Sequence, residues 1–500
     1  MEIANETPMN NVSGPEILKN DTVFETTQAF KLDVEFSDNK NDFIKRMVLC
    51  VIYAVFFTFC LYKNPEGITY PLFSAATIAA YILFTKSVKE KIKPFSYALM
   101  GIIMLLSVNV CMTKSVPLIV FDKIFVFGLF FVMFLNNLYD DVTWDVSRYF
   151  LAIISVIGSS VAYLLDPMID FVRLRRNTDS ETSDKGKNRG TILYILLGFG
   201  ISLPLLGVVL PLLSSSDAVF SDMLSSVFEI KFNGDIIGVV MLTLLIFFVG
   251  YALIKRLYNK FAWLKQPVGD MRKVNPTVAI TVSSVLLVFY ALYSGIQIIF
   301  LFLGFGTLPE GYTYADYAHE GFFQLVFVCL INLVLVLVCR KYSKDNVILK
   351  VMLTLICTCT YIMLFSSAYR MILYISVYGL TFLRVYVLWA LLVIALAMAG
   401  TIILVYKNEF PFFKYSLCVL TITWAAFTFS HPDRIIADYN LTNEMGVNYV
   451  ISSLSDDATP VIIEHGYGLS ESGYVSHEMP KDFRKFNFAQ YEACKAIYGK

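Results

Sequence analysis

The chain has 500 residues, of which 57% are hydrophobic and only 16% are charged, and its mean hydropathy is +0.64. This composition excludes a soluble globular protein and indicates many apolar membrane spans. The formal net charge is zero, so no overall field favours a nucleic-acid partner, and we expect none. The partner that the composition predicts is the lipid bilayer, while membrane-protein partners stay open.

The first part of the chain differs from the rest. Residues 1–45 are polar, mixed in charge and without periodicity, so we expect a disordered tail there and no signal peptide. Beyond it the apolar runs begin, and a helix needs about 20 mostly apolar residues to cross the hydrocarbon core. The runs that reach or approach this length are 47–62, 68–85, 95–113, 117–138, 191–213, 237–254, 277–303, 322–339, 347–367, 385–406 and 412–430.

Lysine and arginine in the connecting loops predict the orientation, because cytoplasmic loops retain them. Residues 86–94 hold four basic residues, 172–190 hold six and 255–276 hold six, whereas 304–321 hold none. The basic loops therefore belong inside, with the N-terminus cytoplasmic and the C-terminus extracytoplasmic.

The same rule requires an even number of crossings between 86–94 and 172–190, yet three apolar runs lie there. We assign 148–165 to an interfacial or re-entrant helix, because it is serine-rich and follows three aspartates, Asp140, Asp141 and Asp145. The alternative is that all twelve runs cross and one loop violates the rule. The predicted fold is thus an all-α polytopic transmembrane helical bundle of about 11 spans, within a range of 10–12.

Changes in composition predict the domain boundaries. The polar run 176–190 is typical of a linker. It separates N-terminal transmembrane helices, 46–175, from a larger main bundle, 191–430. Residues 431–500 form a small polar extramembrane segment, in which NYVISSL and PVIIE fit short strands. If that segment is outside and accessible, a membrane-impermeant thiol reagent should label Cys494 in intact cells.

Two polar stretches fall on the predicted outer side. Residues 214–230 predict an amphipathic helix in the interface, with Ser216 or Asp217 as its N-cap. Residues 310–323 place Asp316 and Glu320 on one helical face at the start of a span. Sealing of the bundle edge explains the first stretch, and helix capping with an aromatic belt explains the second; we prefer these explanations to the alternative of a ligand site. His319 has no second histidine at ligand spacing, so we expect neither a metal nor a cofactor.

A third outer stretch, AYRMILYISVYGLTFLR at 368–384, carries two arginines. An unpaired arginine at the bilayer centre costs about 2.5–3.5 kcal/mol, and a straight helix over 347–384 would measure about 55 Å, longer than the membrane is thick. We therefore expect a bend near Ser366 and Ser367 and a candidate second break at Gly379, so that the stretch lies in the outer interface. If 370–384 is helical, its polar side chains form one stripe, which consists of Arg370, Tyr374, Tyr378, Thr381 and Arg384. This stripe can face the acids on the same side of the membrane, which are Asp217, Asp222, Asp316 and Glu320.

Two features inside the spans leave alternatives open. The run 191–213 is interrupted by glycine and proline, as in the broken helices of transporters, but ordinary membrane helices contain both residues too. Asp122 and Lys123 lie near the start of another span, where they could pair with each other or extend toward the interface.

Several of these motifs also carry a resemblance. In order along the chain they are GIQIIFLF, TYADYAHEGFFQL, RMILYISVYGLTFLR, PDRIIADYNL and DDATPVI. Together they resemble an uncharacterised family of bacterial multi-pass membrane proteins, catalogued as a domain of unknown function, over about residues 190–465. The resemblance implies a bacterial cell membrane and a helical bundle, but no activity. His319 stands where the family leads us to expect an arginine.

Three functions follow from these patterns. The first is a non-catalytic structural, sensor or assembly component, in which the outer charges only hold loops together. The second is a transporter or lipid-handling protein that binds an anionic group through Arg370 and Arg384, because the guanidinium fork matches carboxylate and phosphate. The third is a membrane transferase with Asp217, Asp316 or Glu320 as base, but no nucleotide loop or metal-binding pair accompanies it.

Overall fold

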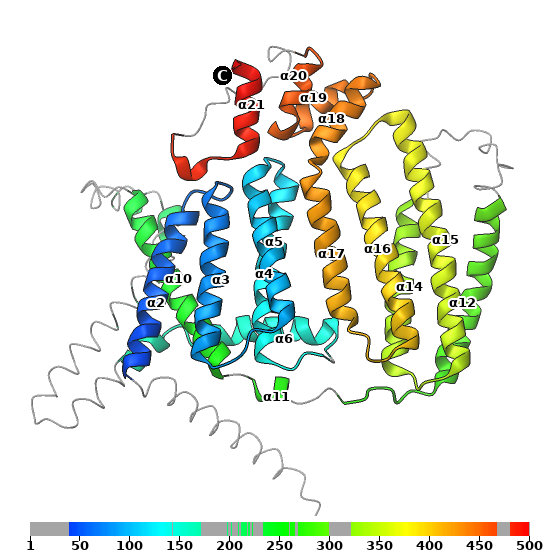
Figure 1. Cartoon of the computed structure of the whole chain (residues 1–500), viewed down its shortest axis with the longest axis horizontal. Coiled ribbons are helices and arrows are strands. Elements are labelled where there is room, and N and C mark those ends of the chain that lie inside the picture. Colours follow the sequence, from blue (N-terminus) through cyan, green and yellow to red (C-terminus); the bar gives the residue numbers. More distant parts are fainter. Residues whose placement is uncertain are drawn as a thin grey trace, which may run out of the picture. The chain divides into compact units, whose positions relative to one another are not determined.

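The computed structural model describes residues 40–142, 144–171, 234–259, 261–265, 269–299, 322–467 and 481–499, with a few positions between 198 and 223. Over this part of the chain the fold is helical throughout (Figure 1), and its single β-contact is an isolated bridge between Val274 and Ser343. The predicted all-α class is confirmed. The tail up to residue 39 and the linker 176–190 lie outside the described residues.

The two expected strands are wrong. NYVISSL lies mostly in helix α19 (Val447–Ser453), and PVIIE lies in α20 (Thr459–Glu464). Helical spacing explains the first, because Val450 and Leu454 are four residues apart and face the same apolar core. In the second, Pro460 stands in the first turn, where its missing N–H is not needed by the helix.

Nine described helices are long and apolar enough to cross a membrane, which confirms a polytopic bundle. They are α2 (Lys40–Leu61), α4 (Pro94–Met112), α5 (Val116–Leu138), α10 (Gly234–Asn259), α12 (Pro276–Gln297), α14 (Phe322–Tyr342), α15 (Val347–Tyr378), α16 (Phe382–Tyr406) and α17 (Phe412–Phe429). Helix α3 (Thr69–Ser87) coincides with the expected run 68–85 but is not among the nine. The expected span 191–213 is described only at isolated positions.

Helix α6 (Val146–Ala162) occupies the run that we assigned to an interfacial or re-entrant helix. Its 17 residues make it shorter than each of the nine candidate spans, and they correspond to about 26 Å of helix. Whether α6 crosses the membrane stays a prediction.

The chain divides into two compact units. Unit 1 contains residues 1–62, 80–90 and 152–266. Its described core pairs α2 with α10 through Phe43, Cys50 and Tyr251. Next to this core the Lys255 ammonium lies 2.5 Å from Asp166 and 2.8 Å from Asp170. A buried lysine therefore has two carboxylate partners in unit 1.

Unit 2 contains residues 63–79, 91–151 and 267–500. In it α4 pairs with α5, α17 packs on both α4 and α16, and α15 packs on α12, α14 and α16 (Figure 1). The apolar core between α12, α14, α15 and α16 includes Phe322, Ile356 and Met398, all buried. Polar side chains also join these spans: the Tyr290 hydroxyl donates to Asn332 (2.7 Å), whose amide donates to Thr360 (2.9 Å).

Helix α15 corrects the prediction of a bend. It runs unbroken for 32 residues, about 48 Å, through Ser366 and Ser367. Both serines are buried: the Ser367 hydroxyl donates to the Met363 carbonyl (2.9 Å), and the Ser366 hydroxyl donates to Gln297 (2.6 Å). Because both hydroxyls have hydrogen-bond partners within an intact helix, no break is required there. The helix is longer than the hydrocarbon core of about 30 Å, and its last residues extend beyond that thickness.

The C-terminal residues of unit 2 fold into a helical cap, which we define as 431–467 and 481–499. Its elements are α18 (Pro432–Thr442), α19, η2 (Asp456–Ala458), α20, η3 (Phe483–Lys485) and α21 (Phe488–Tyr498). The cap has its own apolar core around Ile436, Val450 and Ile462, and it lies at one end of α4, α16 and α17 (Figure 1). We call this end of unit 2 the cap end.

Candidate functional site

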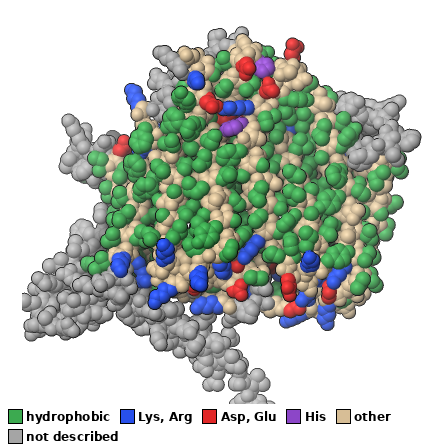
Figure 2. All heavy atoms as spheres, in the orientation of Figure 1, with side chains coloured by type: hydrophobic (Ala, Val, Ile, Leu, Met, Phe, Trp, Pro, Cys, Tyr) green, Lys and Arg blue, Asp and Glu red, His purple; other side chains and the backbone are tan. Residues whose placement is uncertain are grey.

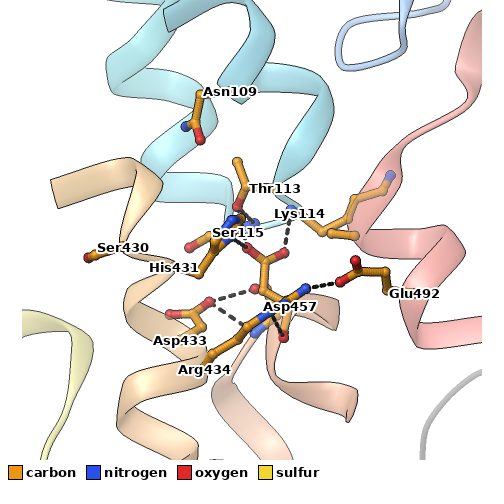
Figure 3. A network of polar contacts seen from close by, with 12 residues as sticks. Asn109, Thr113, Lys114, Ser115, Ser430, His431, Asp433, Arg434, Asp457 and Glu492 are labelled. Carbon is orange, nitrogen blue, oxygen red and sulfur yellow. Dashed lines mark hydrogen bonds and ion pairs between the residues drawn. The ribbon is translucent and has the colours of Figure 1, made fainter. Parts of the chain in front are cut away.

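The most deeply buried carboxylate of the cap holds a loop between two spans. Asp457, in η2, is 1% exposed and accepts two hydrogen bonds from the loop that joins α4 to α5 (Figure 3). The Thr113 hydroxyl donates to Oδ2 at 2.6 Å, and the Lys114 backbone N–H donates to Oδ1 at 2.7 Å. The Thr113 hydroxyl oxygen in turn accepts from the Ser115 N–H (3.1 Å). One side chain of the cap therefore fixes the whole turn.

His431 approaches the same carboxylate from the junction of α17 and α18. Its Nδ1 lies 3.6 Å from Asp457 Oδ2, and its backbone has φ +49°, in the left-handed region. The following residue, Pro432, is the first residue of α18. A histidine tolerates this backbone conformation better than a β-branched residue does, and the sharp turn points its ring at the network (Figure 3).

Asp433 is the second buried carboxylate, 3% exposed. It accepts from the Ser455 hydroxyl at 2.5 Å and from the Ser455 N–H at 3.3 Å. Burial raises the pKa of Asp433, and the nearby charge of Asp457 raises it further, whereas the hydrogen bonds from Ser455 and Ser115 act in the opposite direction. Two carboxyl groups of like charge thus share a buried site.

Arg434 joins this site to the last helix. Its Nε donates to the backbone carbonyl of Asp457 (3.0 Å), and its guanidinium also forms an ion pair with Glu492 of α21 (Figure 3). We call Thr113, Lys114, Ser115, His431, Asp433, Arg434, Ser455, Asp457 and Glu492 the cap network.

The cap is fastened at a second point, the turn between α15 and α16. The Asn440 side chain of α18 accepts from the Leu380 N–H (2.7 Å) and donates to the Leu380 carbonyl (2.8 Å). The Tyr449 hydroxyl accepts from the Phe382 N–H (3.0 Å). At Gly379 the backbone has φ +74°, and an added Cβ would lie 2.6 Å from the Asn440 Oδ1, so any other residue would strain the backbone and displace the Asn440 side chain.

A third fastening lies at the start of α21. The Asn487 amide donates to the carbonyls of Thr113 (3.0 Å) and Glu66 (3.2 Å), and its Oδ1 caps α21 by accepting from the Ala489 N–H. From the loop before α3, the Asn64 amide donates to the Arg484 carbonyl (2.8 Å). The cap is thereby bonded to three separate loops of unit 2.

The predicted arginine stripe is partly assembled next to the second fastening. Tyr374 and Tyr378 lie with ring centroids 5.0 Å apart, and the Arg384 guanidinium lies 4.3 Å from the centroid of the Tyr374 ring. Arg384 donates to the backbone carbonyls of Tyr378 (3.0 Å) and Gly379. Arg384 therefore caps the C-terminal end of α15, where cations and donors are stabilising.

The rest of the stripe departs from a single helical face. Helix α15 ends at Tyr378, and Thr381 is the N-cap of α16, where its hydroxyl accepts from the Arg384 N–H (3.4 Å). The candidate break at Gly379 is confirmed, and the assumption of one helix over 370–384 is wrong. Arg370 is buried within the bundle, 8% exposed, and donates to Gln297 of α12 at 3.3 Å.

Comparison with known proteins adds a family. Residues 100–465 match the model of a domain of unknown function, DUF4153. The chain belongs to the DUF4153 family. This match begins well before residue 190, so the family's extent that we expected from the motifs was too short at its N-terminal side. No curated protein and no solved structure matches the chain.

The DUF4153 match contains most of the cap network, from Thr113 to Asp457, and leaves out Glu492 and the third fastening. It also contains the predicted partners of the arginines. Asp316 and Glu320 lie outside the described residues. Asp217 accepts from the N–H groups of Val219 (2.8 Å) and Phe220 (3.3 Å), as predicted for an N-cap. It belongs to unit 1, whereas the arginines belong to unit 2, so their pairing stays a prediction.

Sequence reasoning missed the carboxylates of this DUF4153 member. Asp456 and Asp457 entered the sequence analysis only as part of the motif DDATPVI, and that motif says nothing about the α4–α5 loop that Asp457 contacts. The local signal in this stretch is DDATPVII, in which a proline and an apolar run follow the two aspartates, as at the start of a helix. Among the described residues, no group of three His, Cys, Asp or Glu side chains could hold a metal ion.

Cys494 corrects another expectation. It lies in α21 and is only 7% exposed. Burial, with a smaller effect of the Asp456 charge, raises the pKa of its thiol. The low exposure keeps a thiol reagent away from Cys494, and the raised pKa leaves less of the thiolate, which is the reactive form. Cys494 is therefore a poor reporter of the side on which the cap lies.

Proposed function

We propose that this protein is a non-catalytic component of the cell membrane, with a structural, sensor or assembly role, whose cap is a rigid module on the extracytoplasmic side. The observation that carries the proposal is the bonding of Asp457. Both of its carboxylate oxygens accept hydrogen bonds from the α4–α5 loop, and such a group holds a fold together. A buried carboxylate with backbone and hydroxyl donors is satisfied without a ligand.

The other fastenings support the same role. Asn440 and Asn487 each use amide groups to bond loops that join spans. A cap bonded to three loops limits the relative motion of the spans that those loops connect. It therefore suits a platform on which a partner or an external signal acts, because a force on the cap reaches several spans at once.

The orientation rests on basic residues. In unit 2, short loops at the end opposite the cap contain Lys91, Lys93, Lys344 and Lys407. At the cap end the α15–α16 turn has no basic residue, and the α2–α3 and α4–α5 loops have one each, Lys63 and Lys114. Figure 2 shows that most of the Lys and Arg side chains visible in this view gather along the edge opposite the cap. By the positive-inside rule this edge is cytoplasmic and the cap is outside.

The parity of the spans favours the same topology. In unit 2, α5 ends and α12 begins at the end opposite the cap. An even number of crossings must then separate them, and the apolar runs between them are 148–165, 191–213 and 237–254. A topology in which α6 does not cross satisfies this requirement.

The anion-binding alternative has less support. Arg384 donates to two backbone carbonyls and stacks on Tyr374, and Arg370 donates to Gln297. A transporter or lipid-handling protein that uses these arginines would have to break some of these contacts. Of the three candidate bases of a transferase, Asp217 already accepts two backbone hydrogen bonds, and Asp316 and Glu320 lie outside the described residues.

Two experiments test the proposal. A membrane-impermeant maleimide should label Asp438→Cys, on the exposed surface of the cap, in intact cells and Lys407→Cys only after permeabilisation; the reverse pattern would refute the orientation. In cells without their own copy, restoration of the wild-type phenotype by Asp433→Asn and Asp457→Asn should follow the amount of folded protein in the membrane. A variant that is as abundant as wild type yet inactive would indicate a chemical role and contradict the proposal.

A further inference from the structure

A carboxylate inside the membrane stands apart from the cap network. Asp122 lies in the candidate span α5 and is fully buried. It is the seventh residue of that helix, about 9 Å along the axis from the end that faces the cap. An ionisable residue at such a depth is rare and usually functional.

The hydrogen-bond donors to Asp122 are both neutral. The Asn109 amide of α4 donates to Oδ2 at 2.6 Å, and the Trp424 indole of α17 donates to Oδ1 at 2.8 Å. Among the described residues no Lys, Arg or His forms an ion pair with Asp122, and Lys123 does not pair with it as we had considered. A carboxylate without a cation is costly to bury in its charged form.

The surroundings exclude water and offer few charges. The rings of Phe121, Phe125 and Trp389 lie 5.0–5.4 Å from that of Trp424, centroid to centroid. Three titratable groups lie around Asp122. Tyr70 of α3 is near enough to respond to the charge of Asp122, and the Lys123 Nζ lies 6.0 Å from the centroid of the Tyr70 ring. Tyr386 of α16 packs on the Trp424 ring. α4 and α17 contribute Asn109 and Trp424, which do not titrate.

Asn109 is suited to both protonation states. Its Oδ1 is buried and has no hydrogen-bond partner in the described structure. The oxygen and nitrogen of a side-chain amide are nearly equal in size, and the group can present either one. The amide nitrogen donates to an ionised Asp122, and after rotation the amide oxygen accepts from the O–H of a protonated one.

We propose that Asp122 is a proton-binding site within the membrane, with Asn109 as the amide that adapts to the bound proton. The proton arrives as H⁺ and bonds to one carboxylate oxygen, so that the carboxyl group becomes neutral. A metal cation suits the site less well, because alkaline-earth ions need about six oxygen ligands. The inference is independent of the proposed function.

The site is connected to the cap through its own helices. Thr113, which bonds Asp457, directly follows α4, and its N–H donates to the carbonyl of Asn109 in the last turn of that helix (3.2 Å). Trp424 lies on α17, which leads into His431 and the cap. Uptake of a proton at Asp122 therefore acts on the two helices that the cap network joins.

Dicyclohexylcarbodiimide tests the proposal, because it reacts with carboxylic acids in apolar surroundings in their protonated form. The acid proton moves to one nitrogen of the reagent and the carboxyl oxygen bonds its central carbon. With full-length protein in phosphatidylcholine vesicles near neutral pH, peptide mass mapping should show modification at Asp122. Two buried carboxylates serve as internal controls and should stay unmodified, because each lies 2.8–2.9 Å from a lysine: Asp141 beside Lys414 and Asp170 beside Lys255.

Infrared spectroscopy decides the question if the reagent cannot reach the site. A protonated carboxyl group gives a C=O stretching band that an ionised one lacks. Wild-type protein should show this band near neutral pH, Asp122→Asn should lose it, and Asp141→Asn should keep it. A spectrum of wild-type protein without the band, or a band that Asp122→Asn retains, would overturn the proposal whatever the outcome of labelling.

Discussion

The cap network and the arginine stripe lie at the same end of unit 2, but their bonds span very different distances along the chain. Arg384 bonds carbonyls five and six residues away. Asp457 bonds groups that are 343 and 344 residues away. The stripe thus completes the end of one helix, whereas the network joins the two ends of the family domain.

The two sets of bonds therefore contribute to stability in different ways, one to a single helix end and the other to the tertiary fold. A helix cap is worth about 1 kcal/mol and its loss leaves the rest of the fold in place. Removal of a buried carboxylate leaves its donors without partners, each at about 1–3 kcal/mol. Substitutions in the network should therefore be the more damaging, and the following predictions test this from the largest expected effect to the smallest.

Asp457→Ala should destabilise the protein by about 3 kcal/mol, because the Thr113 hydroxyl and the Lys114 N–H lose their acceptor in a buried site. Denaturation of the purified protein in detergent micelles measures the loss, and limited proteolysis should show earlier cleavage of the cap. Asp438→Ala, an exposed acid of the same cap, is the control and should stay within about 0.5 kcal/mol of wild type. Equal effects of the two changes would contradict a special role for the network.

Gly379→Ala should cost about 2 kcal/mol, because the added Cβ meets Asn440 at 2.6 Å in addition to the strain of φ +74°. Gly466→Ala is a matched control, since Gly466 has φ +83° and open space around its Cβ position. Its cost should be about 1 kcal/mol from the backbone alone. The difference between the two unfolding free energies measures the second fastening, and no difference would mean that Asn440 gives way.

Arg384→Ala should cost about 1 kcal/mol, the usual worth of a helix-terminal cap. Arg384→Lys should recover only part of this, because an ammonium lacks the planar group that stacks on Tyr374. Thermal unfolding of the three proteins in the same detergent provides the ranking. A loss as large as that of Asp457→Ala would show that the stripe, too, carries tertiary contacts.

The pH dependence of stability should differ in sign between two acids. Asp433 has a raised pKa, so its folded form binds the proton more tightly, and its contribution to stability declines as pH rises from the unfolded value of about 4 through the folded pKa. Asp345, in the α14–α15 loop, has a pKa lowered by Lys350 and Arg340. Its contribution is present above the unfolded pKa and is lost as pH falls through the folded pKa.

The measurement is the melting temperature of each Asn variant minus that of wild type across this pH range. The difference should become more positive with rising pH for Asp433→Asn and more negative for Asp345→Asn. The second effect should be small, because Asp345 is about half exposed and water screens its ion pairs. Slopes of the same sign would show that the burial of Asp433 does not control its titration.

Much of the fold could be predicted because the membrane imposes local rules. Apolar run lengths located the nine described spans, since a helix must bury its own backbone bonds in lipid. Asp217, as one of two candidate N-caps, and Gly379, as a candidate break, were also predicted, because each depends only on neighbouring residues. The bend at Ser366 and Ser367 failed because a length argument cannot see a helix end supported by Asn440 and Gln297 from other elements.

By itself, then, the sequence determined that the chain is an all-α membrane protein, where most spans run and that Gly379 interrupts a helix, because these depend on composition and on contacts a few residues apart. Only the tertiary structure decided that Asp457 holds the α4–α5 loop, that Arg370 turns into the bundle and that Asp122 has neutral partners. These contacts join residues that no periodicity relates, and packing brings them together only once the helices and the cap have formed.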